Sequence, residues 1–217
     1  MTRRVTLREL AKEAGVSVCT ASVVLNGSRS SSQISSDTRR ALQDLARARG
    51  YRPNRTARSL RGGRTQTIGV VPAFVDQNML LGPHLQLVMN AAANTLAEAH
   101  YDLLLLTRYD QAMIDPLLDA ILGGRLDAVM LVSPRTDCRL SQRLSEAGFP
   151  YVVVDGAPDA DDRTFAVDNA AGVELALRHL LDLGHRRIAH ITGRDNIPVA
   201  RLRHRAFEEI LAREGLD

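Results

Sequence analysis

Residues 5–27 read VTLRELAKEAGVSVCTASVVLNG, and this stretch predicts two short helices joined by a tight turn. Thr6 and Glu9 have the spacing of a capping box, in which each side chain accepts a hydrogen bond from the other residue's backbone N–H. Gly15 is suited to end the first helix and Ser17 to cap the second. Two helices joined by a glycine-containing turn form a helix-turn-helix.

A third helix is expected after the polar residues 28–33. Ser35 or Ser36 can cap it, Leu42 and Leu45 repeat with helical spacing, and a glycine at position 50 is suited to end it. The first 52 residues therefore predict a small all-helical domain.

The net charge of +3 is divided unevenly along the chain. Residues 1–65 contain 14 Lys and Arg against 4 Asp and Glu, a net charge of +10, whereas the remaining residues contain 14 against 21, a net charge of −7. A basic head on an acidic body is typical of a protein that binds nucleic acid through its head. Charge alone leaves open the alternative of a solvated basic face without such a partner.

Residues 53–65 predict a linker. Pro53 cannot continue the preceding helix, arginine recurs at every third position from 52 to 64, and Gly62-Gly63 follows. The segment between proline and glycines is too short to be a stable helix by itself. A flexible basic linker and a short helix that forms only on DNA both fit this pattern.

From residue 66 onward, apolar segments alternate with helical patterns. Strands are expected at 67–71, 101–107, 127–132, 151–154, 164–167 and 187–191, with helices near 83–99, 111–123, 138–147, 169–183 and 199–214. Continuous apolar strands between helices indicate a parallel sheet covered on both faces. Ligands bind such sheets outside the carboxyl ends of the strands. The polar residues there are Asp76, Asn78, Thr107, Arg108, Ser133, Asp155, Asp168, Asn169 and residues 193–195.

Several classes of protein are disfavoured. No apolar run reaches the length of a transmembrane helix and the N-terminus lacks the apolar region of a secretory signal, so we expect no membrane partner and a cytoplasmic location. Cys19 and Cys138 have no metal-binding or disulfide pattern and are expected to be reduced. P-loop, GxSxG, HExxH and GxGxxG motifs are absent from the sequence, which predicts neither an enzyme nor a cofactor.

A set of motifs occurs together and in order: VTL at 5–7, AGVS at 14–17, VLNG at 24–27, GYRPN at 50–54 and ARSL at 57–60. In these motifs the chain resembles the LacI/GalR family of bacterial repressors. The resemblance continues into the body and covers nearly the whole chain. It implies an all-α helix-turn-helix head joined to an α/β sensor domain of the periplasmic-binding-protein type, with a Rossmann-type parallel sheet.

The resemblance also implies the domain boundaries. We expect the DNA-binding head over 1–52, the hinge helix or linker over 53–65, a first sensor lobe over 66–163 and the start of a second lobe over 164–217. Family members continue well beyond this point. The chain is therefore expected to be a fragment or a truncated product, with its second lobe incomplete.

In this family the second helix enters the major groove of DNA. By position, the base-facing residues would be Val18, Cys19 and Val23. Unlike the polar readers common in the family, they cannot form bidentate hydrogen bonds with a base, but they can contact a thymine methyl. The alternative is that Val18 and Val23 belong to the helix core. Further DNA contacts are expected from Thr6, Ser17, Thr20, Ser22, Asn26 and Arg29.

The resemblance gives the linker a role as well. Paired hinge helices of the family lie in the minor groove, where a leucine opens the central base step at the cost of unstacking it. Leu60 matches that leucine, and Asn54 and Ala57 are further expected DNA contacts.

The sensor body is expected to bind an effector between its two lobes. The expected effector-binding residues are Asp76, Ser133, Asp155, Asn169 and Arg203, of which Asp155 and Arg203 match effector-contacting positions of the family. Each of the two strongest candidates has an alternative explanation, because Asp155 can instead cap a turn and Arg203 can instead be a solvent-facing helix residue.

The sequence thus predicts a transcriptional repressor whose affinity for a double-stranded DNA operator is controlled by a small, sugar-like effector. A homodimer is expected for the full-length protein. Two alternatives remain open, namely a constitutive DNA-binding protein without a ligand response and a solute-binding sensor.

Overall fold

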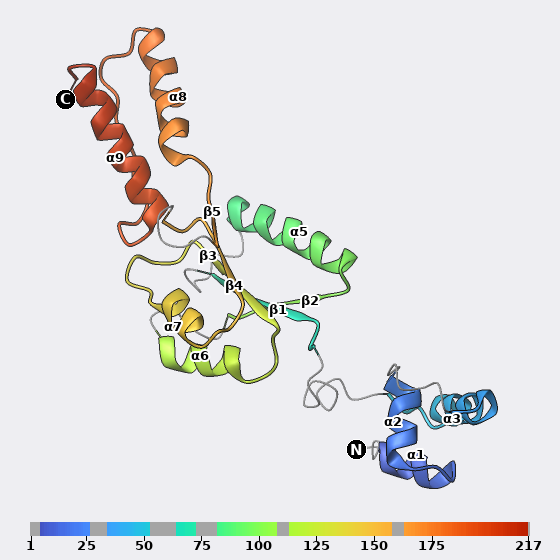
Figure 1. The fold of residues 1–217 in the computed structure, drawn as a ribbon. Coiled ribbons are helices and arrows are strands. Elements are labelled where there is room, and N and C mark those ends of the chain that lie inside the picture. The colour runs from blue at the N-terminus through green and yellow to red at the C-terminus, as the bar shows by residue number, and fades with distance from the viewer. Residues whose placement is uncertain are drawn as a thin grey trace. The chain divides into compact units, whose positions relative to one another are not determined.

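The computed structural model describes residues 5–26, 34–52, 64–72, 82–107, 113–157 and 163–216. The chain divides into two compact units, Met1–Gly63 and Arg64–Asp217 (Figure 1). The predicted divisions at 52/53, 65/66 and 163/164 stay predictions. Five predicted site residues lie outside the described residues: Arg29, Asn54, Ala57, Leu60 and Asp76.

The head contains three helices, α1 (Leu7–Glu13), α2 (Val18–Asn26) and α3 (Ser36–Ala48). The predicted capping box is confirmed, because the Glu9 backbone N–H donates to the Thr6 hydroxyl at 3.3 Å and the Thr6 N–H donates to the Glu9 carboxylate at 2.8 Å. Ser35 caps α3 by accepting from the Thr38 N–H at 3.2 Å.

A small apolar core holds the head together. Leu10, Ala21 and Leu42, one from each helix, are at most 1% exposed. The predicted helix-ending residue Gly15 has φ +65°, the left-handed conformation that glycine adopts without strain. An ion pair between Arg49 and Glu13, 2.7 Å long, joins the end of α3 to α1. Both side chains of the pair are largely exposed, so we attribute the stability of the head mainly to its core.

The body is built on a five-stranded sheet in the order β2-β1-β3-β4-β5, with every neighbouring pair parallel. This confirms the predicted parallel α/β architecture. The strands are β1 (Thr67–Pro72), β2 (Asp102–Leu105), β3 (Ala128–Val132), β4 (Tyr151–Val154) and β5 (Thr164–Phe165).

Helices cover the two faces of the sheet (Figure 1). On one face, α5 (Pro83–Glu98) places Leu85 against Val70 and Val132. On the other face lie α6 (Ile114–Leu122) and α7 (Leu140–Glu146). They pack against strand residues that alternate with Val70 and Val132 and point to the opposite face, such as Val71 and Leu131. The helices α8 (Asn169–Asp182) and α9 (Pro198–Arg213) pack against each other through a cluster of their own, which contains Leu177, Ile210 and Leu211.

One predicted strand is wrong. Residues 187–191 form no strand, although Ile188 packs against the cluster between α8 and α9. A strand requires a neighbour that supplies its ladder hydrogen bonds, and these residues pair with no strand of the described part of the chain. The consequence is seen at Ile191, which is 96% exposed.

We expect Gly69→Ala to lower the free energy of unfolding of the body by about 1–3 kcal/mol. A Cβ at this position would lie 2.7 Å from Leu126 Cδ1 and 3.3 Å from Val129 Cγ2, and both residues are buried. Urea unfolding followed by circular dichroism measures the change. Gly172→Ala is the matched control, because its Cβ would meet nothing within 4 Å. Gly172 is the fourth residue of α8, so its replacement by alanine should raise stability by about 0.5–1 kcal/mol, and equal effects of the two substitutions would contradict the packing described.

Candidate functional site

The start of α2 presents side chains to solvent. The Ser17 hydroxyl caps the helix, because it accepts from the Thr20 N–H at 2.9 Å and lies 2.8 Å from the Thr20 hydroxyl oxygen. The next two residues point outward, since Val18 is 40% exposed and Cys19 is also exposed. Neither is part of the apolar core of the head. This geometry disfavours the alternative that Val18 serves as helix core.

The other predicted DNA contacts of the head differ in exposure. Thr6 and Ser17 are exposed, and Thr20 and Val23 are half-buried. Ser22 is only 6% exposed, and its contact with DNA stays a prediction. Asn26 is the last residue of α2.

A second candidate site is a cleft of about 500 Å³ in the body. It lies at the carboxyl ends of the strands, because Pro72 ends β1, Val132 ends β3, and Ser133 and Asp155 directly follow β3 and β4. This is the edge of the sheet that the strand order predicts for a ligand. The remaining lining residues come from the helices and loops around that edge: His84, Leu85, Val167, Asn169, Ile197, Val199 and Arg203.

Two of the lining residues adopt the left-handed backbone conformation. Ser133 has φ +49° and Asp155 has φ +56°. Backbone bonds fix both, since Ser133 N–H donates to the Val154 carbonyl at 2.7 Å and Asp155 N–H donates to the Phe165 carbonyl at 2.8 Å. Non-glycine residues held in this region concentrate at functional sites. The backbone conformation thus sets the direction in which the two polar side chains leave the ends of the neighbouring strands β3 and β4.

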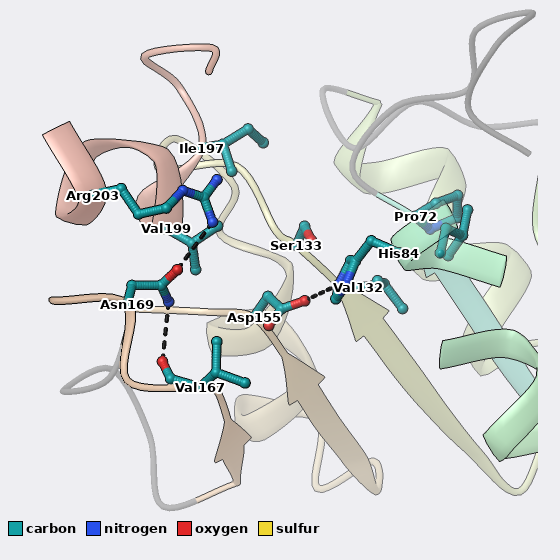
Figure 2. A pocket seen from close by; sticks show the side chains of 11 residues that line it. Pro72, His84, Val132, Ser133, Asp155, Val167, Asn169, Ile197, Val199 and Arg203 are labelled. Atoms are coloured by element: carbon teal, nitrogen blue, oxygen red, sulfur yellow. Dashed lines mark hydrogen bonds and ion pairs between the residues drawn. The ribbon is translucent and has the colours of Figure 1, made fainter. Parts of the chain in front are cut away.

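Asp155 is paired across the cleft with a histidine. Its carboxylate is only 10% exposed and forms an ion-pair contact with His84 Nε2 (Figure 2). His84 is the second residue of α5 and its side chain is 63% exposed. The Asp155 side chain therefore points to a partner in the cleft, which favours the predicted ligand-facing role over the turn-capping alternative.

On the other side of the cleft, Arg203 Nη1 donates to Asn169 Oδ1 at 3.0 Å, and the Asn169 amide donates to the Val167 carbonyl at 3.0 Å (Figure 2). Asn169 is buried at the start of α8, so it can hold the arginine of α9 in one place. Of the predicted effector residues, Ser133, Asp155, Asn169 and Arg203 thus line one cleft. Arg203 is itself exposed, and its bond to Asn169 favours a cleft-lining position over one that faces solvent alone.

Other residues predicted at this edge do not line the cleft. Asp168 caps α8 by accepting from the Ala171 N–H at 2.9 Å, and Thr107 and residues 193–195 are not among the lining residues. Asn78 and Arg108 lie outside the described residues. Conversely, sequence reasoning missed His84 and the apolar residues Ile197 and Val199. Pro83 could have pointed to His84. Proline favours the first turn of a helix, and a helix that follows β1 begins near the carboxyl edge of the sheet, so the residue after Pro83 is placed near the cleft.

The chemistry of the cleft is that of a binding site. Two polar pairs, His84–Asp155 and Asn169–Arg203, face a mainly apolar lining. Such a combination suits a small molecule that has hydroxyl groups and an apolar face. Within the described ranges, no three His, Cys, Asp or Glu side chains are grouped to hold a metal ion. In the same ranges, no helix has the length and apolarity needed to span a membrane.

We expect Asp155→Ala to destabilise the body more than Asp155→Asn, by about 1 kcal/mol, because alanine gains no local hydrogen bond in the left-handed region whereas asparagine tolerates it. Both variants remove the same charge, so each serves as the control of the other. Urea unfolding of the two variants gives the difference, and equal midpoints would show that the backbone conformation of residue 155 imposes no such preference.

Comparison with known proteins yields a family match in the head. The family described as "Bacterial regulatory proteins, lacI family" matches residues 6–54. The chain is also 33% identical over 218 residues to the HTH-type transcriptional regulator CelR of Thermobifida fusca, and 31% identical over 218 residues to the ribose operon repressor of Escherichia coli K12. These alignments cover 99% and 98% of the chain and 63% of each relative. The chain thus spans less than two thirds of those relatives.

Solved structures show the same fold. A transcriptional regulator CelR–cellobiose complex matches 99% of the chain and 63% of its own, with 31% identity and a TM-score of 0.63. A lac repressor dimer bound to operator and the anti-inducer ONPF matches 99% of the chain and 64% of its own, with 23% identity and a TM-score of 0.80. At this identity the second likeness supports the fold alone.

Proposed function

We propose that the chain, whose head matches the lacI family of bacterial regulatory proteins over residues 6–54 and which is 33% identical to the regulator CelR, is part of a sequence-specific DNA-binding repressor controlled by a small sugar. The protein would act in the cytoplasm as a homodimer, with two heads on one near-palindromic operator. It would be a binding protein and not an enzyme.

One observation carries the DNA-binding part of the proposal. The first residues of α2, which follow the Ser17 cap, are exposed apolar or nearly apolar side chains on a head with an excess of basic residues. An apolar side chain gains nothing from contact with water, but it can pack on a thymine methyl in the major groove. Val18, Cys19 and Val23 would read bases, while Thr6, Ser17, Thr20 and Asn26 would contact the DNA backbone.

Residues 53–65 would act as the hinge between head and body. In this proposal Leu60 enters the central base step of the operator, with Asn54 and Ala57 beside it. Arg29 would add a contact with a phosphate.

The cleft of the body would bind the effector. The CelR structure contains cellobiose, and the cleft residues of this chain are suited to a neutral sugar. The Asp155 carboxylate can accept from one or two hydroxyl groups, and Arg203, held by Asn169, can donate to another. His84 would contact the same ligand from α5. The apolar residues Val167, Ile197 and Val199 can pack against the face of a sugar ring.

Selection from a pool of random duplexes, at near-physiological salt, tests the DNA-binding proposal. We expect enrichment of a pseudo-palindrome. Val18→Ala should weaken binding to the selected sequence by roughly tenfold, because it removes two methyl groups from an apolar contact. Val152→Ala, at a similarly exposed valine of the body, is the control and should change nothing. Salt-sensitive binding without any enriched sequence would show that the head contacts only phosphates and would refute sequence-specific repression.

Calorimetric titration with cellobiose and with ribose tests the sugar site. We expect one of the two to bind, and Arg203→Leu to weaken that binding by about tenfold or more, because it removes a charged donor from the cleft. Arg201→Leu is a matched control, since Arg201 is an exposed arginine of the same helix and does not line the cleft. An equal loss in both variants would indicate damage to α9 and not to a sugar contact.

A further inference from the structure

The start of the body holds the end of the linker through one carboxylate. Asp127 Oδ1 accepts from the Thr65 backbone N–H at 2.7 Å and from the Thr65 hydroxyl at 2.8 Å, while Oδ2 accepts from the Gln66 N–H at 2.9 Å. Both oxygens are thus used, and all three bonds go to two consecutive residues of the linker end. We refer to Asp127 with Thr65 and Gln66 as the Asp127 clasp.

Backbone bonds extend the clasp to the neighbouring strands. The Gln66 carbonyl accepts from Asp102 N–H at 2.8 Å, at the start of β2, and the Thr67 carbonyl accepts from Asp127 N–H at 2.9 Å, just before β3. Gln66 has φ +54°, so the chain turns sharply between its last linker residue and β1. The linker end is therefore fixed at the amino ends of three adjacent strands.

The carboxylate is ionised at neutral pH. Burial raises the pKa of Asp127. The hydrogen bonds from Thr65 and Gln66 and the charge of Arg64 lower the pKa, and together they outweigh the effect of burial, so the pKa lies below its ordinary value. Hydrogen bonds to a charged acceptor are stronger than those between neutral groups. Three such bonds on one carboxylate hold Thr65 and Gln66 to Asp127.

The clasp and the cleft lie at opposite ends of the same two strands. The strands β1 and β3 are paired from Ile68 with Ala128 to Pro72 with Val132, and Pro72 and Val132 line the cleft. At about 3.3 Å per residue, roughly 13 Å of continuous parallel ladder separates the two. A shift of these strands at the cleft moves the residues that hold the linker, because a hydrogen-bonded ladder of buried strands does not deform freely.

We propose that Asp127 is a positioning residue, which fixes where the linker leaves the sensor body and so carries the state of the cleft to the DNA-binding part of the chain. The proposal rests on the proposed function. It assigns Asp127 no contact with DNA or with the effector. Its role is to fix the end of the linker on the body, without which the linker residues that precede Thr65 would reach the operator in many positions.

The variants are chosen to loosen the clasp in steps. Asp127→Ala removes all three bonds and Asp127→Asn retains one acceptor oxygen. Thr65→Val removes the hydroxyl bond to Asp127 and the 3.3 Å bond that the Thr65 hydroxyl accepts from the Thr67 N–H, and it keeps both backbone bonds to Asp127. Asp119→Ala, at an exposed aspartate of α6, is the matched control for loss of charge. Thermal melting of each variant identifies any that fails to fold, and the two milder variants keep the test valid in that case.

Two measurements are combined. The first is the rate at which trypsin produces the fragment that begins at Thr65, identified by mass spectrometry, because cleavage after Arg64 requires this bond to leave the clasp. The second is the ratio of affinity for the selected operator to affinity for random duplex. We expect Asp127→Ala to speed the cleavage and to reduce the affinity ratio, each by about fivefold or more, with Asp127→Asn and Thr65→Val in between and Asp119→Ala unchanged.

Faster cleavage with an unchanged affinity ratio would show a purely structural anchor and overturn the proposal, as would unchanged cleavage. A wild-type chain that binds the operator and random duplex with equal affinity would contradict the proposed function itself, and the clasp would then have no hinge to position. A preference for the operator that is lost only in the Asp127 and Thr65 variants would support both the proposed function and the role of Asp127.

Discussion

The parallel pairing of β1 with β3 is the constraint on which both ends of the body depend. Its register runs from Ile68 with Ala128 to Pro72 with Val132. Because both strands point the same way, the residues that follow them meet at one edge and the residues that precede them meet at the other. The cleft lies at the first edge and the anchored linker end at the second. A slip of one residue would turn Val70 and Val71 to the wrong faces and disturb both sites.

The polar residues of the cleft depend on this frame for their precision. Ser133 and Asp155 directly follow neighbouring strands, and each is held in the left-handed conformation by a backbone bond to the next strand. Their side chains are thus aimed by the sheet and not by a flexible loop. The arginine of α9 is held differently, through the buried Asn169 at the start of α8. Ser133 and Asp155 on one side of the cleft and Arg203 on the other are therefore held in place by two independent sets of hydrogen bonds.

Features that depend on near neighbours could be predicted from the sequence. The Thr6–Glu9 capping box, the Ser17 cap and the parallel order of strands rest on residues a few positions apart or on repeated apolar runs, and the structure has them as expected. Contacts between distant residues could not be predicted. Asp127 meets Thr65 across 62 positions and His84 meets Asp155 across 71, and no periodicity specifies which side chains the fold will bring together.

The one strand that was wrongly predicted has a physical cause as well. Residues 187–191 have the composition of a strand, but strand formation depends on a partner and not on propensity alone. The local pattern was correctly recognised there, and the tertiary environment determined the outcome.

The exposure of Cys19 has a practical consequence. Its thiol lies on the second residue of α2, whereas the only other cysteine, Cys138, is half-buried and packs against the core of the body. A thiol-directed fluorophore added under native conditions should therefore attach mainly to the head. Without the introduction of a new cysteine, the molecule thus offers a natural attachment point within the surface proposed to meet the bases, so the same label would also block that surface.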